Sequence, residues 1–203
     1  MTHTRSPQLF PYWQRFTVLA ALLAAAFLWP ASTLEWSREG VPGGGYWRLL
    51  TGHWVHLGLN HLLLNLAGLL VTGLLFTRHP PLPIWLSYLV LSPLAISSGL
   101  FLAAPELDWY RGFSGCLHGL LVFTALYNIR AETRWSLIIL GFLLIKLATE
   151  VFLYPAVGEN PLVGGRVIVQ SHWLGAFAGL AAGLLTLSRA PRVMASPGPP
   201  SPE

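Results

Sequence analysis

Six apolar stretches separated by short polar segments make up most of the chain. A membrane-spanning helix needs about 20 mainly apolar residues, and most of these stretches reach or approach that length. Proline or arginine follows most of them, which is typical of helix ends near a membrane surface. The pattern predicts an all-α membrane protein with six transmembrane helices, at residues 16–29, 57–76, 84–104, 114–129, 135–154 and 169–187.

The polar ends divide the chain into three parts. We expect a short cytoplasmic N-terminal segment at residues 1–15, a six-helix domain at residues 16–188 and a disordered cytoplasmic tail at residues 189–203, which is rich in Pro and Ser. The first apolar stretch is short and has a basic flank, so a signal peptide is the alternative. A retained helix is favoured because no clear Ala-x-Ala cleavage site follows it.

The arginines predict the orientation, because cytoplasmic loops carry the excess of Lys and Arg. If the N-terminus is inside, seven arginines fall in the cytoplasmic segments and four in the outer loops. Both termini are therefore expected on the cytoplasmic side. The second, fourth and sixth helices then all run from the outside to the inside.

Composition supports a membrane location and removes other classes of protein. The chain is 54% hydrophobic and 10% charged, whereas soluble domains have about 25% charged residues. The sequence pI of about 9.6 does not indicate nucleic acid, because the arginines are spread singly between apolar runs. A single cysteine, Cys116, excludes an internal disulfide framework.

The polar residues in the apolar stretches fall at one depth. His61 and Asn65 lie in the first turns of the second helix, Ser114 opens the fourth, and His172 lies in the first turn of the sixth. Since these helices run in the same direction, the four side chains are expected at a similar depth in the outer part of the bilayer. We therefore predict one site there.

Ser114 is the candidate nucleophile. It lies between Gly112 and Gly115, which permit close backbone approach and unusual dihedral angles. A helix N-terminus offers free N–H groups for a developing oxyanion. The fourth helix is roughly 24 Å long at about 1.5 Å per residue, short of a hydrocarbon core of about 30 Å. Its start is therefore expected in a sunken, water-accessible cavity; packing alone is the alternative role for a serine in a membrane helix.

His172 is the candidate general base, because an ionisable residue inside a membrane span is a functional candidate. The alternative is a histidine that only hydrogen-bonds a neighbouring helix. Glycines at intervals of four are expected to let the fourth and sixth helices approach closely, so that His172 reaches Ser114. They are Gly115 and Gly119 on the fourth helix, and Gly175, Gly179 and Gly183 on the sixth.

Other polar side chains have several possible roles. His118 shares a helix face with Ser114 and is the rival base, with a supporting or packing role as its alternative. His61 and Asn65 share a face and suit an oxyanion hole, or they only tie helices together. Lys146 and Glu150 are expected to neutralise each other as a structural pair, with a proton relay as the alternative.

Two further alternatives are disfavoured. A metal site at His53, His56 and His61 would require ligands on different helix faces, and no cysteine or carboxylate joins them. Cys116 lies on another helix face from Ser114 and has no obvious base. We therefore expect no metal and no cofactor.

Four of these motifs resemble those of the rhomboid intramembrane serine proteases. The resemblance covers residues 46–187, and its only departure is Phe113, where Leu or Ile is usual. The similar motifs are Gly112-Phe113-Ser114-Gly115 (Gly-x-Ser-Gly), His61-Leu62-Leu63-Leu64-Asn65 (His-x-x-x-Asn), Ser171-His172-Trp173-Leu174-Gly175 (His-x-x-Gly) and the pair Trp47-Arg48. The run from Ser114 to Gly119 is similar to the rhombosortase branch of that family.

The resemblance implies a fold, an activity and roles for residues. The fold would be a six-helix rhomboid-like bundle in the bacterial inner membrane, with the site open to the periplasm. Ser114 would be the nucleophile and His172 the base, a dyad without an aspartate. His61, Asn65 and the Ser114 N–H would form the oxyanion hole, and His56 would lie above the site.

The implied substrates are transmembrane proteins, and for the rhombosortase branch proteins with a C-terminal signal of Gly-Gly, a transmembrane helix and a basic cluster. A non-catalytic rhomboid-like protein that binds client helices is the alternative, which the presence of both dyad residues disfavours.

Overall fold

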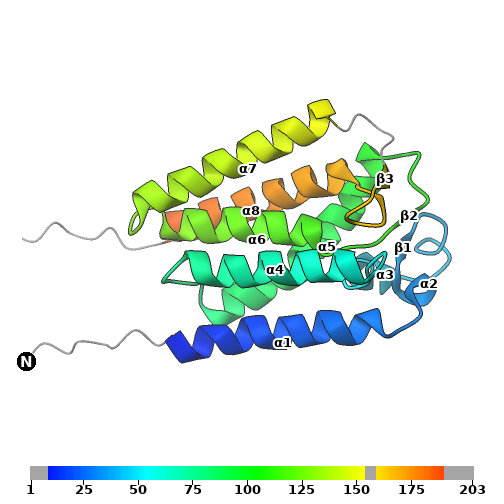
Figure 1. The fold of residues 1–203 in the computed structure, drawn as a ribbon, viewed down its shortest axis with the longest axis horizontal. Helices are drawn as coiled ribbons and strands as arrows, with labels where there is room; N and C mark the ends of the chain where they lie inside the picture. Colours follow the sequence, from blue (N-terminus) through cyan, green and yellow to red (C-terminus); the bar gives the residue numbers. More distant parts are fainter. Residues whose placement is uncertain (1–8, 154–158, 190–203) are drawn as a thin grey trace, which may run out of the picture.

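The computed structural model describes residues 9–153 and 159–189, and within them eight helices. Six of these are long and lie side by side in a bundle (Figure 1). The long helices are α1 (Leu9–Phe27), α4 (Leu59–Leu75), α5 (Leu82–Ala103), α6 (Ser114–Asn128), α7 (Thr133–Leu153) and α8 (Val169–Arg189). The short elements are α2 (Ala31–Leu34), α3 (Arg48–Thr51) and the antiparallel pairs of β1 (Trp36–Ser37) with β2 (Trp109–Tyr110) and of β3 (Glu159–Asn160) with β4 (Gly165–Arg166).

The six long helices correspond to the six predicted ones. The first begins at Leu9 rather than at residue 16, so part of the expected polar N-terminal segment is helical. Within the described residues, the helices at Leu82–Ala103 and Thr133–Phe152 are by length and composition able to cross a membrane, while Tyr12–Phe27 and Leu59–Leu75 are apolar but shorter. The count of six spans, the orientation and the domain limits stay predictions, and residues 1–8 and 190–203 lie outside the described residues.

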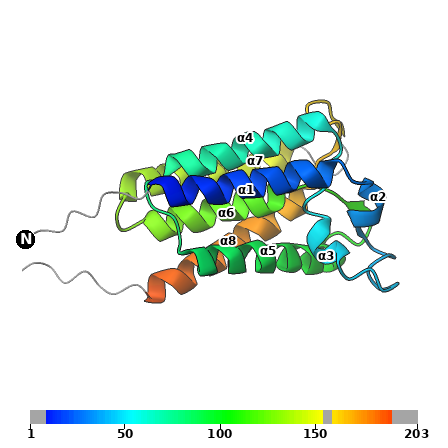
Figure 2. The same ribbon diagram turned by 90° about the horizontal axis from the view of Figure 1, so that it is seen from below.

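The helices alternate in direction. α1 begins and α8 ends at the same end of the bundle (Figures 1 and 2). α4, α6 and α8 begin at the opposite end, together with α2, α3 and the strand pairs; we call this the loop end. The predicted alignment of the starts of the second, fourth and sixth helices is therefore present.

Glycine allows α6 and α8 to pack with their backbones in contact. A Cβ atom on Gly115 would lie 2.7 Å from the carbonyl oxygen of Ser171, which is closer than van der Waals contact permits. A Cβ on Gly175 or Gly179 would overlap the carbonyl oxygen of Gly115 or Gly119. The predicted close approach of these two helices is confirmed.

Arg38 fastens the loop end to α5. The last carbonyl groups of a helix have no partner within the helix, and the Arg38 guanidinium donates hydrogen bonds to several at the end of α5 and just beyond it. The acceptors are the carbonyl oxygens of Leu100, Phe101, Ala104 and Leu107, at 2.7–3.4 Å. The β1–β2 pair then holds the segment that leads into α6.

α7 lies on the outside of the bundle (Figure 1). It packs mainly on α6 and also contacts α8, and many of its apolar side chains are exposed, including Phe142, Ile145 and Phe152. Such a surface is expected to face lipid.

Candidate active site

The chain turns sharply just before Ser114. Gly112 has φ +135°, a conformation that residues with a Cβ rarely adopt. Its N–H donates to the carbonyl of Gly52 at 3.1 Å, and its own carbonyl accepts from the hydroxyl of Tyr110 at 2.7 Å. Ser114 follows as the first residue of α6 and is partly buried.

Ser114 and His172 are in contact across the α6–α8 interface. The Oγ atom of Ser114 lies 2.8 Å from Nε2 of His172, and His172 is only 5% exposed. The contact exists because Gly115 and Gly175 let the first turns of the two helices touch. The structure thus brings together the two residues that the sequence suggested as nucleophile and base.

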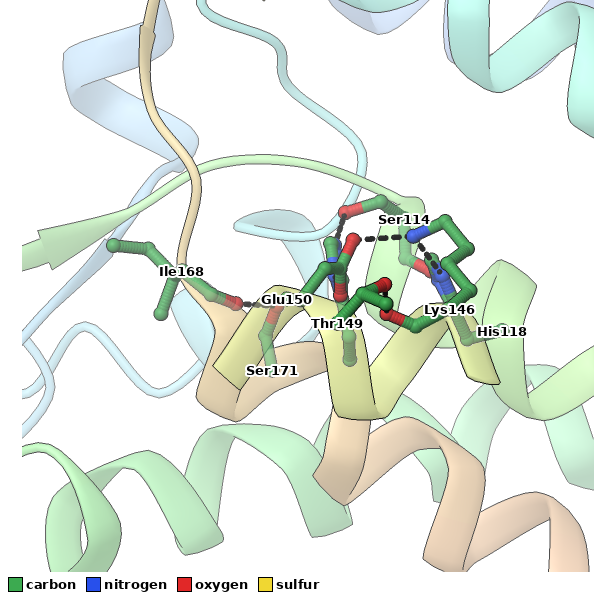
Figure 3. Close-up of polar contacts among 8 residues, drawn as sticks. Ser114, His118, Lys146, Thr149, Glu150, Ile168 and Ser171 are labelled. Atoms are coloured by element: carbon green, nitrogen blue, oxygen red, sulfur yellow. Dashed lines mark hydrogen bonds and ion pairs between the residues drawn. The ribbon is translucent and has the colours of Figure 1, made fainter. Parts of the chain in front are cut away.

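Three further side chains complete a ring of polar contacts around this pair, and Figure 3 shows those from α6 and α7. Nδ1 of His172 lies 2.8 Å from Oε2 of Glu150, and Glu150 also pairs with Lys146. Nζ of Lys146 lies 2.9 Å from Nε2 of His118. Nδ1 of His118 lies 2.7 Å from the carbonyl oxygen of Ser114, which closes the ring.

Sequence reasoning missed the contact of Glu150 with His172. The predicted pairing of Lys146 with Glu150 is present, but it is only part of the arrangement, because Glu150 also contacts His172. A signal existed in the sequence. α7 ends at the loop end, so Glu150, near its C-terminus, lies at the depth of the first turn of α8.

His118 does not contact the hydroxyl of Ser114. One of its ring nitrogens is at the Ser114 carbonyl and the other at Lys146, while the Ser114 hydroxyl is at His172. The His118 ring stacks on the His172 ring with centroids 4.2 Å apart. This contact fits a supporting role.

His61 lies against the sharp turn. A Cβ atom on Gly112 would lie 2.7 Å from Cε1 and 3.0 Å from Nε2 of His61, so only glycine leaves room for the ring. Nδ1 of His61 is 3.4 Å from the Leu57 N–H, as an acceptor. The proton of a neutral ring then resides on Nε2, which points a donor toward the start of α6.

Asn65 is near the site but its amide is engaged within α4. Its Nδ2 donates to the carbonyl of His61 at 3.0 Å, and the side chain is 3% exposed. In this arrangement Asn65 braces its own helix, and a role as an oxyanion donor requires a different side-chain rotamer.

His56 packs edge-on against His61, with ring centroids 5.1 Å apart. It is 4% exposed, and neither ring nitrogen has a hydrogen-bond partner. Burial, and then the proximity of His61, lower the pKa of His56 from 6.5 to about 3, so it is neutral near pH 7.

A second Ser–His contact lies deeper in the protein. Nε2 of His53 is 3.0 Å from Oγ of Ser97, and both residues are fully buried. The Ser97 hydroxyl donates to the carbonyl of Leu49 at 2.8 Å, so it accepts from His53. A serine whose proton is held by a carbonyl and that substrate cannot reach is a structural link between α5 and the segment around α3.

Potential metal ligands gather in the same ring. His118, Glu150 and His172 each offer a ligand atom within 4.8 Å of the others, and this is the only such group of three among the described residues. The ammonium of Lys146 already contacts two of the three. Two of the three candidate ligands are therefore engaged by this ammonium.

Comparison with known proteins finds one family that matches the chain. A family model described as the Rhomboid domain matches residues 43–189, which include all the residues of the site. No curated protein sequence matches the chain.

Proposed function

We propose that this chain, which belongs to the rhomboid family, is a serine endopeptidase that cleaves transmembrane proteins inside the membrane. The family and the apolar helices α5 and α7 indicate an integral membrane protein. Members of the family act on transmembrane substrates within the bilayer. The observation that carries the proposal is the 2.8 Å contact between Ser114 Oγ and His172 Nε2 at a helix N-terminus.

The reaction begins at Ser114. His172 takes the hydroxyl proton on Nε2 while Oγ bonds to the carbonyl carbon of the scissile peptide. The tetrahedral intermediate collapses when Nε2 returns the proton to the leaving amine nitrogen, which breaks the C–N bond. Water then gives a proton to Nε2 as its oxygen bonds to the acyl carbon. The bond from that carbon to Oγ breaks as Nε2 returns the proton to Ser114, which releases the new carboxylate end.

Three donors are available for the oxyanion. The N–H of Ser114 belongs to the first turn of α6, where backbone N–H groups have no partner within the helix. Nε2–H of His61 points toward the same turn. Asn65 supplies a third donor once its amide leaves the carbonyl of His61. Removing one such donor typically costs about 10²–10³-fold in rate.

Substrate access is proposed between α4 and α7. These helices carry many exposed apolar side chains, among them Leu63 and Leu70 on α4 and Ile145 on α7. Neither is part of the tight α6–α8 pair that holds Ser114 and His172. The loop that includes β3 and β4 is proposed as a cap over the site; its residues 155–158 lie outside the described residues.

The finer assignment concerns the substrate and the compartment. The run from Ser114 to Gly119 is similar to the rhombosortase branch, which supports processing of a C-terminal signal made of Gly-Gly, a transmembrane helix and a basic cluster. The arginine distribution supports cleavage on the periplasmic side of the bacterial inner membrane.

The test is co-expression with a reporter that ends in such a signal. Release of the reporter is expected with the wild-type chain and not with Ser114→Ala or His172→Ala. Ser87→Ala is the matched control, because Ser87 is an exposed serine of α5 that bonds only its own helix. Ser97→Ala tests the second Ser–His contact and should leave cleavage intact.

A membrane binder without activity would give a different result. The chain would then retain the reporter in a complex without cleaving it, and a fluorophosphonate probe would not label Ser114. That pair of results would contradict the proposed activity.

A further inference from the structure

Glu150 contacts the Ser114–His172 pair from a third helix. Its Oε2 lies 2.8 Å from Nδ1 of His172, and its side chain is 12% exposed. We infer that Glu150 is a positioning residue that converts the pair into a Ser–His–Glu triad. It holds the Nδ1 proton of His172 so that the Nε2 lone pair faces Ser114. The inference rests on the proposed protease function and adds a residue to it.

The proton positions in this ring of polar contacts can be derived by starting at the carbonyl oxygen of Ser114 and moving through His118 and Lys146 to Glu150. A backbone carbonyl can only accept, so His118 carries its proton on Nδ1, at the Ser114 carbonyl. Nε2 of His118 is therefore an acceptor, and Lys146 donates to it as an ammonium. The same ammonium donates to Glu150. Every contact up to the carboxylate has one donor and one acceptor.

The carboxylate then fixes the tautomer of His172. An ionised Glu150 can only accept, so the proton on His172 is at Nδ1. Nε2 is left as an acceptor, 2.8 Å from the hydroxyl of Ser114. This is the tautomer that a general base for Ser114 requires, and the opposite tautomer would place two donors face to face.

Glu150 also acts when charge develops. As Nε2 takes the serine proton, His172 becomes a cation whose Nδ1–H stays bonded to the carboxylate, and this charge-assisted bond is stronger than a neutral one. The carboxylate takes no proton. The other charged or titratable side chains that face His172 are Lys146 on α7, His118 on α6 and His61 on α4.

A structural ion pair alone does not account for this arrangement. One carboxylate oxygen would suffice for Lys146, four residues away on the same helix. The second oxygen is instead directed across the helix interface to His172, and both ring nitrogens of His172 are occupied as a result.

The tautomer of His172 gives a test that does not require activity. The full chain would be labelled with ¹⁵N-histidine in detergent micelles, and the His172 signal, one of seven histidines, assigned by its loss in His172→Ala. In the wild type at pH 7 we expect Nδ1 to carry the proton. A proton on Nε2 in the wild type would overturn the inference without any variant of Glu150.

The second measurement is the rate at which a fluorophosphonate labels Ser114. Glu150→Gln is expected to shift the tautomer of His172 and to slow labelling by about 10²-fold or more. Glu150→Asp keeps the carboxylate and should recover part of the rate. The matched control is Glu132→Gln, which removes a carboxylate that bonds Thr77 at the other end of the bundle.

The outcomes separate the inference from the proposed function. A Glu150→Gln variant with wild-type tautomer and labelling within twofold of wild type would overturn the triad. A wild-type chain that the probe leaves unlabelled would contradict the protease function, while the tautomer would still decide whether Glu150 positions His172.

Discussion

The imidazole ring of His118 stacks on that of His172, with centroids 4.2 Å apart and planes inclined by only 20°. His118 thus covers one face of the ring that contacts Ser114, while its own nitrogens bond the Ser114 backbone and Lys146. The stack limits rotation of His172 about its side-chain bonds. Loss of His118 and loss of His172 should therefore affect the activity of Ser114 to different degrees.

His118→Ala should weaken activity, and His172→Ala should abolish it. Loss of the stack leaves the Ser114–His172 contact in place but less well oriented, so fluorophosphonate labelling should fall on the order of 10-fold, compared with about 10²–10⁴-fold or more for loss of a base. The measurement is the second-order labelling rate of purified protein. The reverse ranking of the two variants would identify His118 as the base.

Gly175→Ala should strongly destabilise the fold. The new methyl group would overlap the backbone carbonyl of Gly115, and backbone cannot move aside as a side chain can. We expect a loss of about 3 kcal/mol or more, seen as a lower melting temperature in detergent. Gly141→Ala on α7 is the control, because nothing lies within 4 Å of its Cβ position. There, reduced backbone freedom should raise stability by about 0.5–1 kcal/mol.

Arg38→Met should also destabilise the fold, although Arg38 contacts no residue of the candidate site. It removes the guanidinium hydrogen bonds to four carbonyl oxygens at and just beyond the end of α5, of which those of Leu100 and Ala104 keep a backbone N–H donor. The expected cost is about 3 kcal/mol. Arg166→Met removes an arginine whose ion pair with Glu106 is exposed and 4.0 Å long, and should change stability by less than about 0.5 kcal/mol. Equal melting temperatures for the two variants would contradict the capping role.

Stability should fall on acidification. Burial lowers the pKa of His53 and of His56 from 6.5 to about 3 in the folded chain. The unfolded chain therefore binds more protons below pH 6.5, and each histidine removes about 1.4 kcal/mol of stability per pH unit from there toward pH 3. The measurement is the melting temperature in detergent between pH 7 and pH 5.

His56→Phe isolates one of these contributions. It keeps a ring against His61 and gives up no hydrogen bond, because neither ring nitrogen of His56 has a partner. The variant should lose less stability between pH 7 and pH 5 than the wild type, by about one proton's contribution. An unchanged pH dependence would show that the pKa of His56 is the same in the folded and the unfolded chain.

Hydropathy and helix direction predict most of the fold and about half of the residues of the candidate site. Long apolar runs predict long helices, and their ends agree with the structure within a few residues except at the start of α1. The shared depth of the helix starts predicts that Ser114 and His172 lie close together, and the glycine spacing predicts the contact of α6 with α8; the structure has both.

The missed features depend on contacts between distant parts of the chain. β1 and β2 are only two residues long and lie about seventy residues apart in the sequence, so no periodic pattern predicts their pairing. The depth of Glu150 could be read from the sequence, but its contact with His172 also depends on how α7 is rotated about its axis, and the pairing of Lys146 with Glu150 on one face gave a sufficient account of both residues without it. The rotamer of Asn65 depends on whether a substrate oxygen is present to compete with the carbonyl of His61.

The division of the site between a rigid and a loose part links helix motion to reactivity. Ser114 and His172 belong to two backbones locked by glycine, whereas Glu150 is carried by α7, whose outer face is largely uncovered. If α7 moves about 1 Å outward, Glu150 leaves hydrogen-bond range of Nδ1. A gap wide enough to admit a client helix would then separate Glu150 from His172, and closure behind the client would restore the contact. Under the proposed function, Ser114 would therefore react only after α7 has returned to its closed position.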